Sequence, residues 1–320
     1  MQGKTVFLVG LIVVLACGGG NTVQSLYAQS APAGSSQYLR NSEAIVLKEP
    51  LDGRGGGLIA FENEANGDYN FELWVMNADG SGQTRLTNSP GYDGAPSFSP
   101  DRKKIVFSSA RDGAAHLYVF DLDALAKGNT NPPLRKLTTS GRNYYPAWSP
   151  DNSRIAFSVY NDSNVFELYT MNIDGGNATR LVDLQNSSHA AWSVDGEKIA
   201  FVSGVGEGQE IYCIDADGQN LKRLTNNAVS DNMPDWSPDG RKIAYSSSGR
   251  SYDIWIMNSD GSNARSLVSV SGLDEFPKWS PDGTCIAFRS ANQIFSIKPD
   301  GSDKRQLTSL RGYSMPYDWR

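Results

Sequence analysis

A run of the type Ile-Ala-Phe recurs six times along the 320-residue chain, and this repetition limits the possible folds more than any other feature. The runs begin at Ile59, Ile105, Ile155, Ile199, Ile243 and Ile286. Successive runs lie 43 to 50 residues apart, which is the length of one supersecondary unit. Such a unit cannot bury its apolar faces alone, so it stacks against copies of itself.

Each repeat contains four short strand-like segments separated by tight turns. The first segment ends in a motif such as Trp236–Asp239 (Trp-Ser-Pro-Asp), in which Pro and Asp favour a turn. The Ile-Ala-Phe run follows, and a third segment such as Ile254–Met257 leads to an Asp-Gly turn. The fourth segment ends in Arg-Leu-Thr, as at Arg223–Thr225. A continuous apolar run indicates a strand buried on both faces, so this pattern predicts the blade of a β-propeller.

The two ends of the repeated region complement each other. The first repeat starts at Leu58 without its Trp segment, and Met315–Trp319 supplies a Trp segment that no further repeat follows. We therefore predict an all-β fold, a six-bladed β-propeller with four antiparallel strands per blade, in which the C-terminal strand closes the first blade. Closure removes the sheet edges that a linear array would expose.

The repeat resembles that of the TolB propeller family. The residues that carry the resemblance are 234–245 (Pro-Asp-Trp-Ser-Pro-Asp-Gly-Arg-Lys-Ile-Ala-Tyr), with the Ile-Trp-Ile-Met-Asn and Arg-Leu-Thr segments. Related repeats occur in the propellers of prolyl-oligopeptidase-type peptidases. The resemblance covers Leu58–Arg320, and about forty residues between Cys17 and Leu58 are too few for the α/β domain that precedes the TolB propeller. It implies a periplasmic interaction scaffold, which in TolB binds the lipoprotein Pal.

Residues 1–17 have the pattern of a signal peptide, with Lys4 before the apolar segment Val6–Ala16. That segment is too short to span a bilayer, which needs about 20 residues. It ends in a sequence that resembles a bacterial lipobox, so we expect lipidation of Cys17 and a membrane anchor. The alternative is cleavage after Ala28, which would release a soluble secreted protein.

The rest of the sequence divides into two parts. Residues 18–57 are rich in Gly, Ser and Gln, which predicts a flexible linker, and residues 58–320 form the propeller. The net charge of −6 and the lack of a basic run disfavour nucleic-acid binding. We expect a monomer at the periplasmic or cell-surface side of the membrane.

The segments that lead into the Trp strands are the candidate binding site. Because the strands of a blade are antiparallel, these segments gather at one end of the propeller and surround the mouth of its channel. They differ among repeats in aromatic, acidic and His content, and such variation in loops is typical of binding sites. The predicted rim residues are Tyr92, Asp93, Asn143, Tyr144, Tyr145, His189, Asp231, Asn232, Asp274, Glu275, Phe276 and Tyr313.

Three functions remain open for this rim, beside the alternative that it is an ordinary solvated ring of loops. The first is capture of an envelope protein or peptide through aromatic anchors. The second is a hydrolase or lyase acting on sugars or esters, with His189 and rim carboxylates as acid–base groups. The third is a carbohydrate-binding module. The sequence lacks a Gly-x-Ser-x-Gly motif and holds two His, so we expect no catalytic residues and no cofactor, although channel carboxylates could bind Ca²⁺ weakly.

Overall fold

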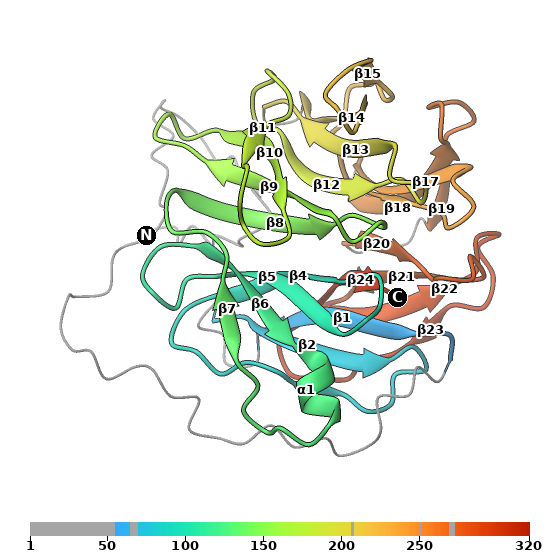
Figure 1. Ribbon diagram of the computed structural model, residues 1–320. Helices are drawn as coiled ribbons and strands as arrows, with labels where there is room; N and C mark the ends of the chain where they lie inside the picture. The colour runs from blue at the N-terminus through green and yellow to red at the C-terminus, as the bar shows by residue number, and fades with distance from the viewer. Residues whose placement is uncertain (1–54, 65–69, 206–207, 250, 269–272) are drawn as a thin grey trace, which may run out of the picture. The chain divides into compact units, whose positions relative to one another are not determined.

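The computed structural model describes residues 55–64, 70–205, 208–249, 251–268 and 273–320. These residues form six four-stranded sheets arranged around an axis (Figure 1), so the predicted six-bladed propeller is confirmed. The predicted signal peptide, Cys17 and most of the linker lie outside the described residues. No helix in the described part of the protein is long and apolar enough to cross a bilayer.

The strands occupy four positions in each blade, counted outward from the axis. The innermost strands are β24 (Tyr313–Trp319), β4 (Asp93–Phe98), β8 (Arg142–Trp148), β12 (Ser188–Trp192), β16 (Asp231–Trp236) and β20 (Glu275–Trp279). The second strands are β1 (Leu58–Glu64), β5 (Lys104–Ser109), β9 (Arg154–Tyr160), β13 (Lys198–Ser203), β17 (Lys242–Ser248) and β21 (Ile286–Ser290).

The outer positions complete the blades. The third strands are β2 (Glu72–Asn77), β6 (His116–Asp121), β10 (Phe166–Asn172), β14 (Glu210–Asp215), β18 (Tyr252–Asn258) and β22 (Gln293–Ile297). The fourth strands are β3 (Thr84–Arg85), β7 (Leu134–Lys136), β11 (Thr179–Arg180), β15 (Lys222–Arg223), β19 (Arg265–Val268) and β23 (Arg305–Gln306). We number the blades 1 to 6 by their second strands, from β1 to β21.

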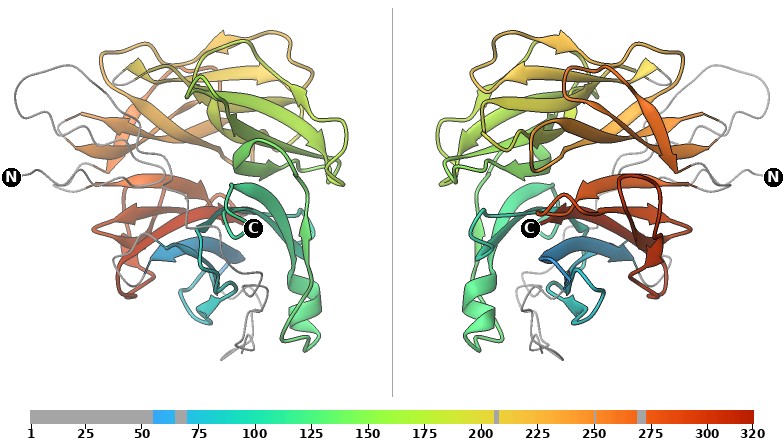
Figure 2. Two further views of the ribbon diagram at one scale, coloured as in Figure 1. Left: turned by 90° about the vertical axis from the view of Figure 1, so that its left-hand side faces the viewer. Right: turned by 90° about the vertical axis from the view of Figure 1, so that its right-hand side faces the viewer.

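The apolar core lies between the blades. Ala60 in β1 and Phe107 in β5 belong to one cluster that joins blades 1 and 2, and both side chains are fully buried. The Ala at this position of blades 3 to 6 takes part in the same way, because a small side chain lets neighbouring sheets approach closely, and blade 2 has Val106 there. The two views in Figure 2 show the sheets stacked around the axis, with helix α1 (Leu122–Ala126) at the periphery, in the loop after β6.

In four of the six blades a Leu-Thr pair continues the ladder beyond the short fourth strand, through Thr87, Thr138, Thr225 and Thr308. The hydroxyl of Thr87 accepts a hydrogen bond from the backbone N–H of Leu73 at 2.9 Å and donates one to Glu72 Oε2 at 2.6 Å. Thr225 accepts from the N–H of Ile211 in the same way, again at 2.9 Å. The motif thus recurs because a Thr side chain satisfies a buried backbone donor of the third strand.

The C-terminal strand closes the ring as predicted. Strand β24 pairs antiparallel with β1, with Ile59 opposite Trp319. The backbone of Leu58 exchanges two hydrogen bonds with Arg320, which extends this pairing by one residue. Gly57, at a φ of 124°, lies directly beside this junction, and a Cβ atom there would stand 2.4 Å from the carbonyl oxygen of Arg320.

Gly57→Ala should therefore loosen the closure of blade 1. We expect a loss of about 1–3 kcal/mol from the positive φ alone, and a further loss from the collision with Arg320. The midpoint of thermal unfolding measures the change. The matched control is Gly113→Ala, since Gly113 has a φ of 96° but open space around the added methyl group. Equal losses in the two variants would contradict a specific role of the close approach at Gly57.

Candidate functional site

Each innermost strand carries a β-bulge just before its Trp or Phe. In blades 2 to 6 the register shifts so that two residues oppose one residue of the second strand. The first of the two has a left-handed backbone although it is not glycine, with φ between 51° and 58° at Ala95, Tyr145, His189, Met233 and Phe276. Such a φ is unfavourable for bulky side chains, and a bulge re-aims the side chain it carries.

Blade 1 reaches a similar arrangement by a different route. Pro316 is the third residue before Trp319 and cannot adopt a positive φ. The register shift in β24 leaves Tyr317 as its extra residue. Tyr317 then packs against Phe276 of blade 6, with ring centroids 5.2 Å apart.

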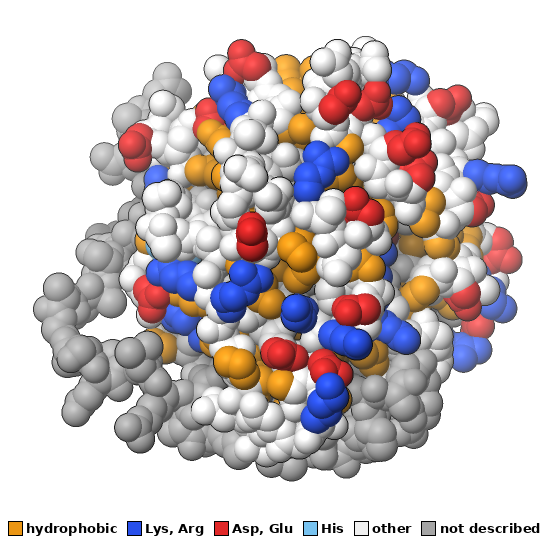
Figure 3. Space-filling view, in the orientation of Figure 1, with side chains coloured by type: hydrophobic (Ala, Val, Ile, Leu, Met, Phe, Trp, Pro, Cys, Tyr) orange, Lys and Arg blue, Asp and Glu red, His pale blue; other side chains and the backbone are white. Residues whose placement is uncertain are grey.

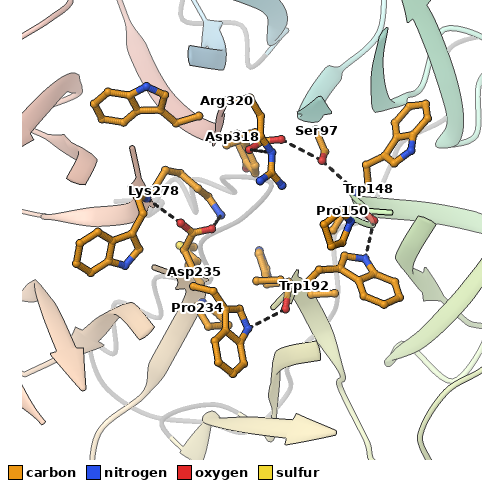
Figure 4. A pocket seen from close by; sticks show the side chains of 18 of the residues that line it. Ser97, Trp148, Pro150, Trp192, Pro234, Asp235, Lys278, Asp318 and Arg320 are labelled. Carbon is orange, nitrogen blue, oxygen red and sulfur yellow. Dashed lines mark hydrogen bonds and ion pairs between the residues drawn. The ribbon is translucent and has the colours of Figure 1, made fainter. Parts of the chain in front are cut away.

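The bulged residues form one end of a cavity on the propeller axis, which we call the floor. The floor comprises Ala95, Tyr145, His189, Met233, Phe276 and Tyr317. The rings of Tyr145 and His189 are stacked with centroids 3.9 Å apart. The cavity has a volume of about 250 Å³, and its lining reaches the Ser-Pro-Asp turns, where the exposed residues Val194 and Arg320 mark its mouth. Figure 4 shows Arg320 among the side chains that line the cavity.

The wall of the cavity contains the six residues that directly precede the Trp or Phe of each innermost strand. Three of these side chains accept a hydrogen bond from the backbone N–H of the following blade. Asp318 Oδ2 accepts from Phe98 at 2.8 Å, and Asp235 Oδ2 accepts from Trp279 at 2.8 Å. Ser97 Oγ accepts from Trp148 at 3.1 Å. These contacts join neighbouring blades at the channel.

The wall is apolar on its other side. Ala147 and Ala191 occupy the same position in blades 3 and 4 and offer no side-chain acceptor. Here the indole of a Trp joins each pair of neighbouring blades. Trp192 Nε1 donates to the carbonyl of Ala147 at 3.0 Å, and Trp236 Nε1 donates to the carbonyl of Ala191 at 3.1 Å. Figure 4 shows the first of these contacts across the cavity from Asp235 and Lys278.

The charged groups of the wall are paired. Lys278 Nζ lies 3.3 Å from Asp235 Oδ1, and Arg320 Nε lies 3.3 Å from Asp318 Oδ1. Burial raises the pKa of Asp235, and the charge of Lys278 opposes that rise. Burial and, to a smaller extent, the charge of Lys278 lower the pKa of His189 to about 3, so the imidazole is neutral at ordinary pH. The described wall therefore carries two cations and two carboxylates, all on one side.

Three of the twelve predicted rim residues line this cavity: Tyr145, His189 and Phe276. Carboxylates of the rim are instead buried at the starts of the innermost strands. Asp93 is fully buried, pairs with Arg111 Nη2 at 2.7 Å and accepts from the hydroxyl of Ser109. These interactions hold the loops of the blades together.

The other rim residues are also engaged in packing. Asp231 accepts from Ser247 and Asn227, and Asn143 donates to the carbonyl of Ser140. Tyr144 packs on Phe166, Tyr92 donates to Glu62, and the Arg289 guanidinium lies over the Tyr313 ring. The remaining three are buried, and they are Asn232, Asp274 and Glu275.

No acid–base pair forms around His189 among the described residues. Its Nδ1 lies 2.9 Å from the hydroxyl of Ser188, and its Nε2 has no hydrogen-bond partner there. Those residues also include no cluster of three His, Cys, Asp or Glu side chains placed to hold a metal ion. The described residues of the cavity thus offer apolar contact surface, together with Lys278 and Arg320 as hydrogen-bond donors.

Glu62 supports the floor from the second strand β1. Its carboxylate is fully buried and accepts from the backbone of Ala95 at 3.0 Å and from the hydroxyls of Tyr92 and Tyr317. A Cβ at Gly94 would lie 2.1 Å from Glu62 Oε2, so only glycine leaves room for this carboxylate. Burial raises the pKa of Glu62 to about 8, against hydrogen bonds that lower it.

This buried carboxyl predicts a pH dependence of stability. Between pH 4.5 and about 8 the folded protein retains the Glu62 proton that the unfolded protein releases. The contribution of this proton to the free energy of unfolding is therefore complete below pH 4.5, and it is lost as the pH rises toward 8. In the Glu62→Gln variant the midpoint of thermal unfolding should decrease less between pH 4.5 and 8 than in the wild type. The exposed control Glu197→Gln should show the same decrease as the wild type. A Glu62→Gln protein with an unchanged slope would contradict the assignment.

Comparison with known proteins agrees with this geometry. A model of the TolB beta propeller domain matches residues 134–319. The uncharacterized protein Atu1656 of Agrobacterium fabrum is 31% identical over 150 residues, which are 42% of this chain and 48% of that protein. The Tol-Pal system protein TolB of Anaeromyxobacter dehalogenans is 31% identical over 111 residues, which are 35% of this chain and 24% of that protein. The chain spans less than half the length of these curated relatives.

A solved structure extends the similarity to the whole ring. The crystal structure of TolB from Acinetobacter baumannii superposes with a TM-score of 0.71 at 25% identity, covering 82% of this chain and 67% of that one. The family model covers more than half of the sequence. The chain therefore belongs to the TolB beta propeller domain family.

Proposed function

We propose that this protein is an extracytoplasmic scaffold that holds a segment of another envelope protein in the cavity on its axis. The observation that carries the proposal is the asymmetric cavity of about 250 Å³, with an aromatic floor and a wall that is apolar on one side and charged on the other. A pocket of this kind orients a ligand through a few polar groups while apolar surface provides the contact.

The size of the cavity limits what enters it. Binding pockets for small molecules typically measure about 300–1,000 Å³, so this cavity accommodates one or two side chains or the end of a polypeptide. Tyr145 and Phe276, predicted as aromatic anchors, form the floor that the inserted group contacts. The remaining partner surface then rests on the Ser-Pro-Asp turns around the mouth.

The cellular setting belongs to the same proposal. Similarity to a Tol-Pal system protein supports a location outside the cytoplasm, and the lipobox-like sequence supports a lipid anchor at Cys17. The face seen in Figure 3 carries Lys and Arg interspersed with Asp and Glu, without the single-sign field that nucleic-acid binding requires. Mass spectrometry of the mature N-terminus distinguishes a lipidated Cys17 from cleavage after Ala28.

Val194 at the mouth tests the site of capture. Its side chain is 51% exposed, and it replaces the Pro that stands in the equivalent turns. A photo-crosslinking residue at position 194, introduced in intact cells, should yield one discrete product whose partner mass spectrometry identifies. Val194→Glu should then weaken binding of that purified partner at least tenfold, because an unpaired carboxylate would enter an apolar contact.

The matched control is Leu221→Glu, since Leu221 is also partly exposed but lies in an outer turn. Calorimetric titration of wild type and both variants with the identified partner provides the comparison. Equal affinities for all three proteins, or equal crosslinking from positions 194 and 221, would exclude the cavity mouth as the binding surface.

A further inference from the structure

A single arginine is buried next to the floor of the cavity, with two carboxyl groups near it. Arg289 in β21 is 1% exposed, and Glu275 in β20 and Glu62 in β1 are fully buried. Glu275 lies directly opposite Arg289 in the pairing of β20 with β21, and its Oε2 is 3.3 Å from Arg289 Nη1. The same Nη1 lies 3.6 Å from the sulfur of Met315, whose opposite residue in β1 is Glu62. The guanidinium therefore reaches from the strand pair of Glu275 to the strand pair that carries Glu62.

We call Glu62, Glu275 and Arg289 the Arg289 cluster, and its charges do not balance when both carboxyl groups are ionised. Within the described part of the protein, neither oxygen of Glu275 nor Nε of Arg289 has a hydrogen-bond partner, and no cation pairs directly with Glu62. The charge of Arg289 lowers the pKa of both carboxyl groups, so one cation acts on two acids. A second carboxylate would leave an unpaired charge in a buried site, which is strongly unfavourable. One of the two carboxyl groups is therefore favoured to retain its proton.

The ionisable groups around the cluster do not supply a second cation. Burial raises the pKa of Glu62 to about 8. Burial, together with the smaller effect of Asp274, raises the pKa of Glu275 to about 7. Lys304 acts on Asp274 and donates to the hydroxyl of Ser290. The other groups that face the cluster are phenols, namely Tyr92 and Tyr317 at Glu62 and Tyr313 at Arg289.

Both carboxyl groups are joined to the floor of the cavity. Glu62 accepts hydrogen bonds from the backbone of Ala95 and from the hydroxyl of Tyr317, and both residues belong to the floor. Glu275 directly precedes the floor residue Phe276, whose ring packs on the ring of Tyr317. A change of charge in the cluster therefore acts on the floor through direct contacts.

We propose that the Arg289 cluster is a proton switch next to the floor, in which Glu62 and Glu275 share one proton and its release to solvent changes the floor. The cluster has no net charge while one carboxyl group is ionised, and it carries a net charge of −1 when both are. The titration of the floor does not require a partner. Its effect on capture rests on the proposed function: the affinity for the partner should change over the pH interval in which the shared proton is released.

The carboxyl signals of ¹³C-labelled glutamate in the full-length protein test the sharing directly. Glu62 and Glu275 should titrate in two steps, and the upper step is the release of the shared proton. In Glu275→Gln the remaining carboxyl group, Glu62, has Arg289 to itself, so its midpoint should fall by at least about one pH unit. In Glu62→Gln only the lower step should remain. The matched control is Glu72→Gln, which should leave both steps unchanged: the pKa of Glu72 is also raised to about 7, chiefly by burial, but its partner is Arg85.

The backbone amides of the floor provide the second readout. In the ¹⁵N-labelled wild type and in Glu72→Gln, the amide signals of Ala95, Phe276 and Tyr317 should shift with the upper step. That step should be missing from the same signals in Glu62→Gln and in Glu275→Gln. An ion pair with a merely structural role would leave the floor amides constant over this interval. The dispersed amide spectrum reports at the same time whether each variant is folded.

The outcomes separate this inference from the proposed function. A midpoint of Glu62 that is the same with and without the Glu275 carboxyl group, or floor amides that stay constant across the upper step, would overturn the switch. Carboxyl and amide titrations that follow the pattern above support it. If they do so while the partner identified by crosslinking binds equally on both sides of the upper step, the switch remains and the proposed mode of capture in the cavity fails.

Discussion

The innermost strand of every blade has one edge that no other strand can pair with, because the axis of the ring lies beside it. The backbone groups along that edge still need partners when they are buried. This protein meets the requirement between Phe98 and Asp318, and between Trp279 and Asp235, with a carboxylate from the preceding blade. Where alanine replaces that residue, the side chain offers no acceptor, and the indole of the following blade's Trp donates to the alanine carbonyl instead. The chemistry of the cavity thus follows from the edge that closure leaves at the centre.

The sequence was sufficient to predict the blade count, the four-strand repeat and the closing strand. Each of these depends on local chemistry that recurs along the chain: an apolar run buried on both faces in every copy, and in most copies a Ser-Pro-Asp turn or a Thr that bonds to the third strand. Gly57 and Trp319 lie at opposite ends of the propeller sequence, yet they meet because only one arrangement leaves no incomplete blade. Repetition made this inference possible from a single sequence.

The candidate site was predicted less completely, and the β-bulge is the reason. Tyr145, His189 and Phe276 adopt left-handed backbone without the Gly or Asn that usually indicates it. A shift of one residue decides which side chains face the axis. Rim carboxylates such as Asp93 are buried against Ser109, a partner 16 residues later in the sequence, and the same spacing joins Asp231 to Ser247. That recurring Asp–Ser spacing is a signal from which their structural role could have been inferred.

The closing strand also has a consequence for how the protein is made. Strand β24 supplies both the last segment of blade 1 and the Asp318 carboxylate that bonds to Phe98 in blade 2. This strand is the last of the propeller strands in chain order, so β1 and the channel face of β4 remain unfinished until all the other blades have been synthesised. Closure of the ring therefore comes after synthesis of the other blades, and it depends on contacts of very long sequence separation, which slow folding.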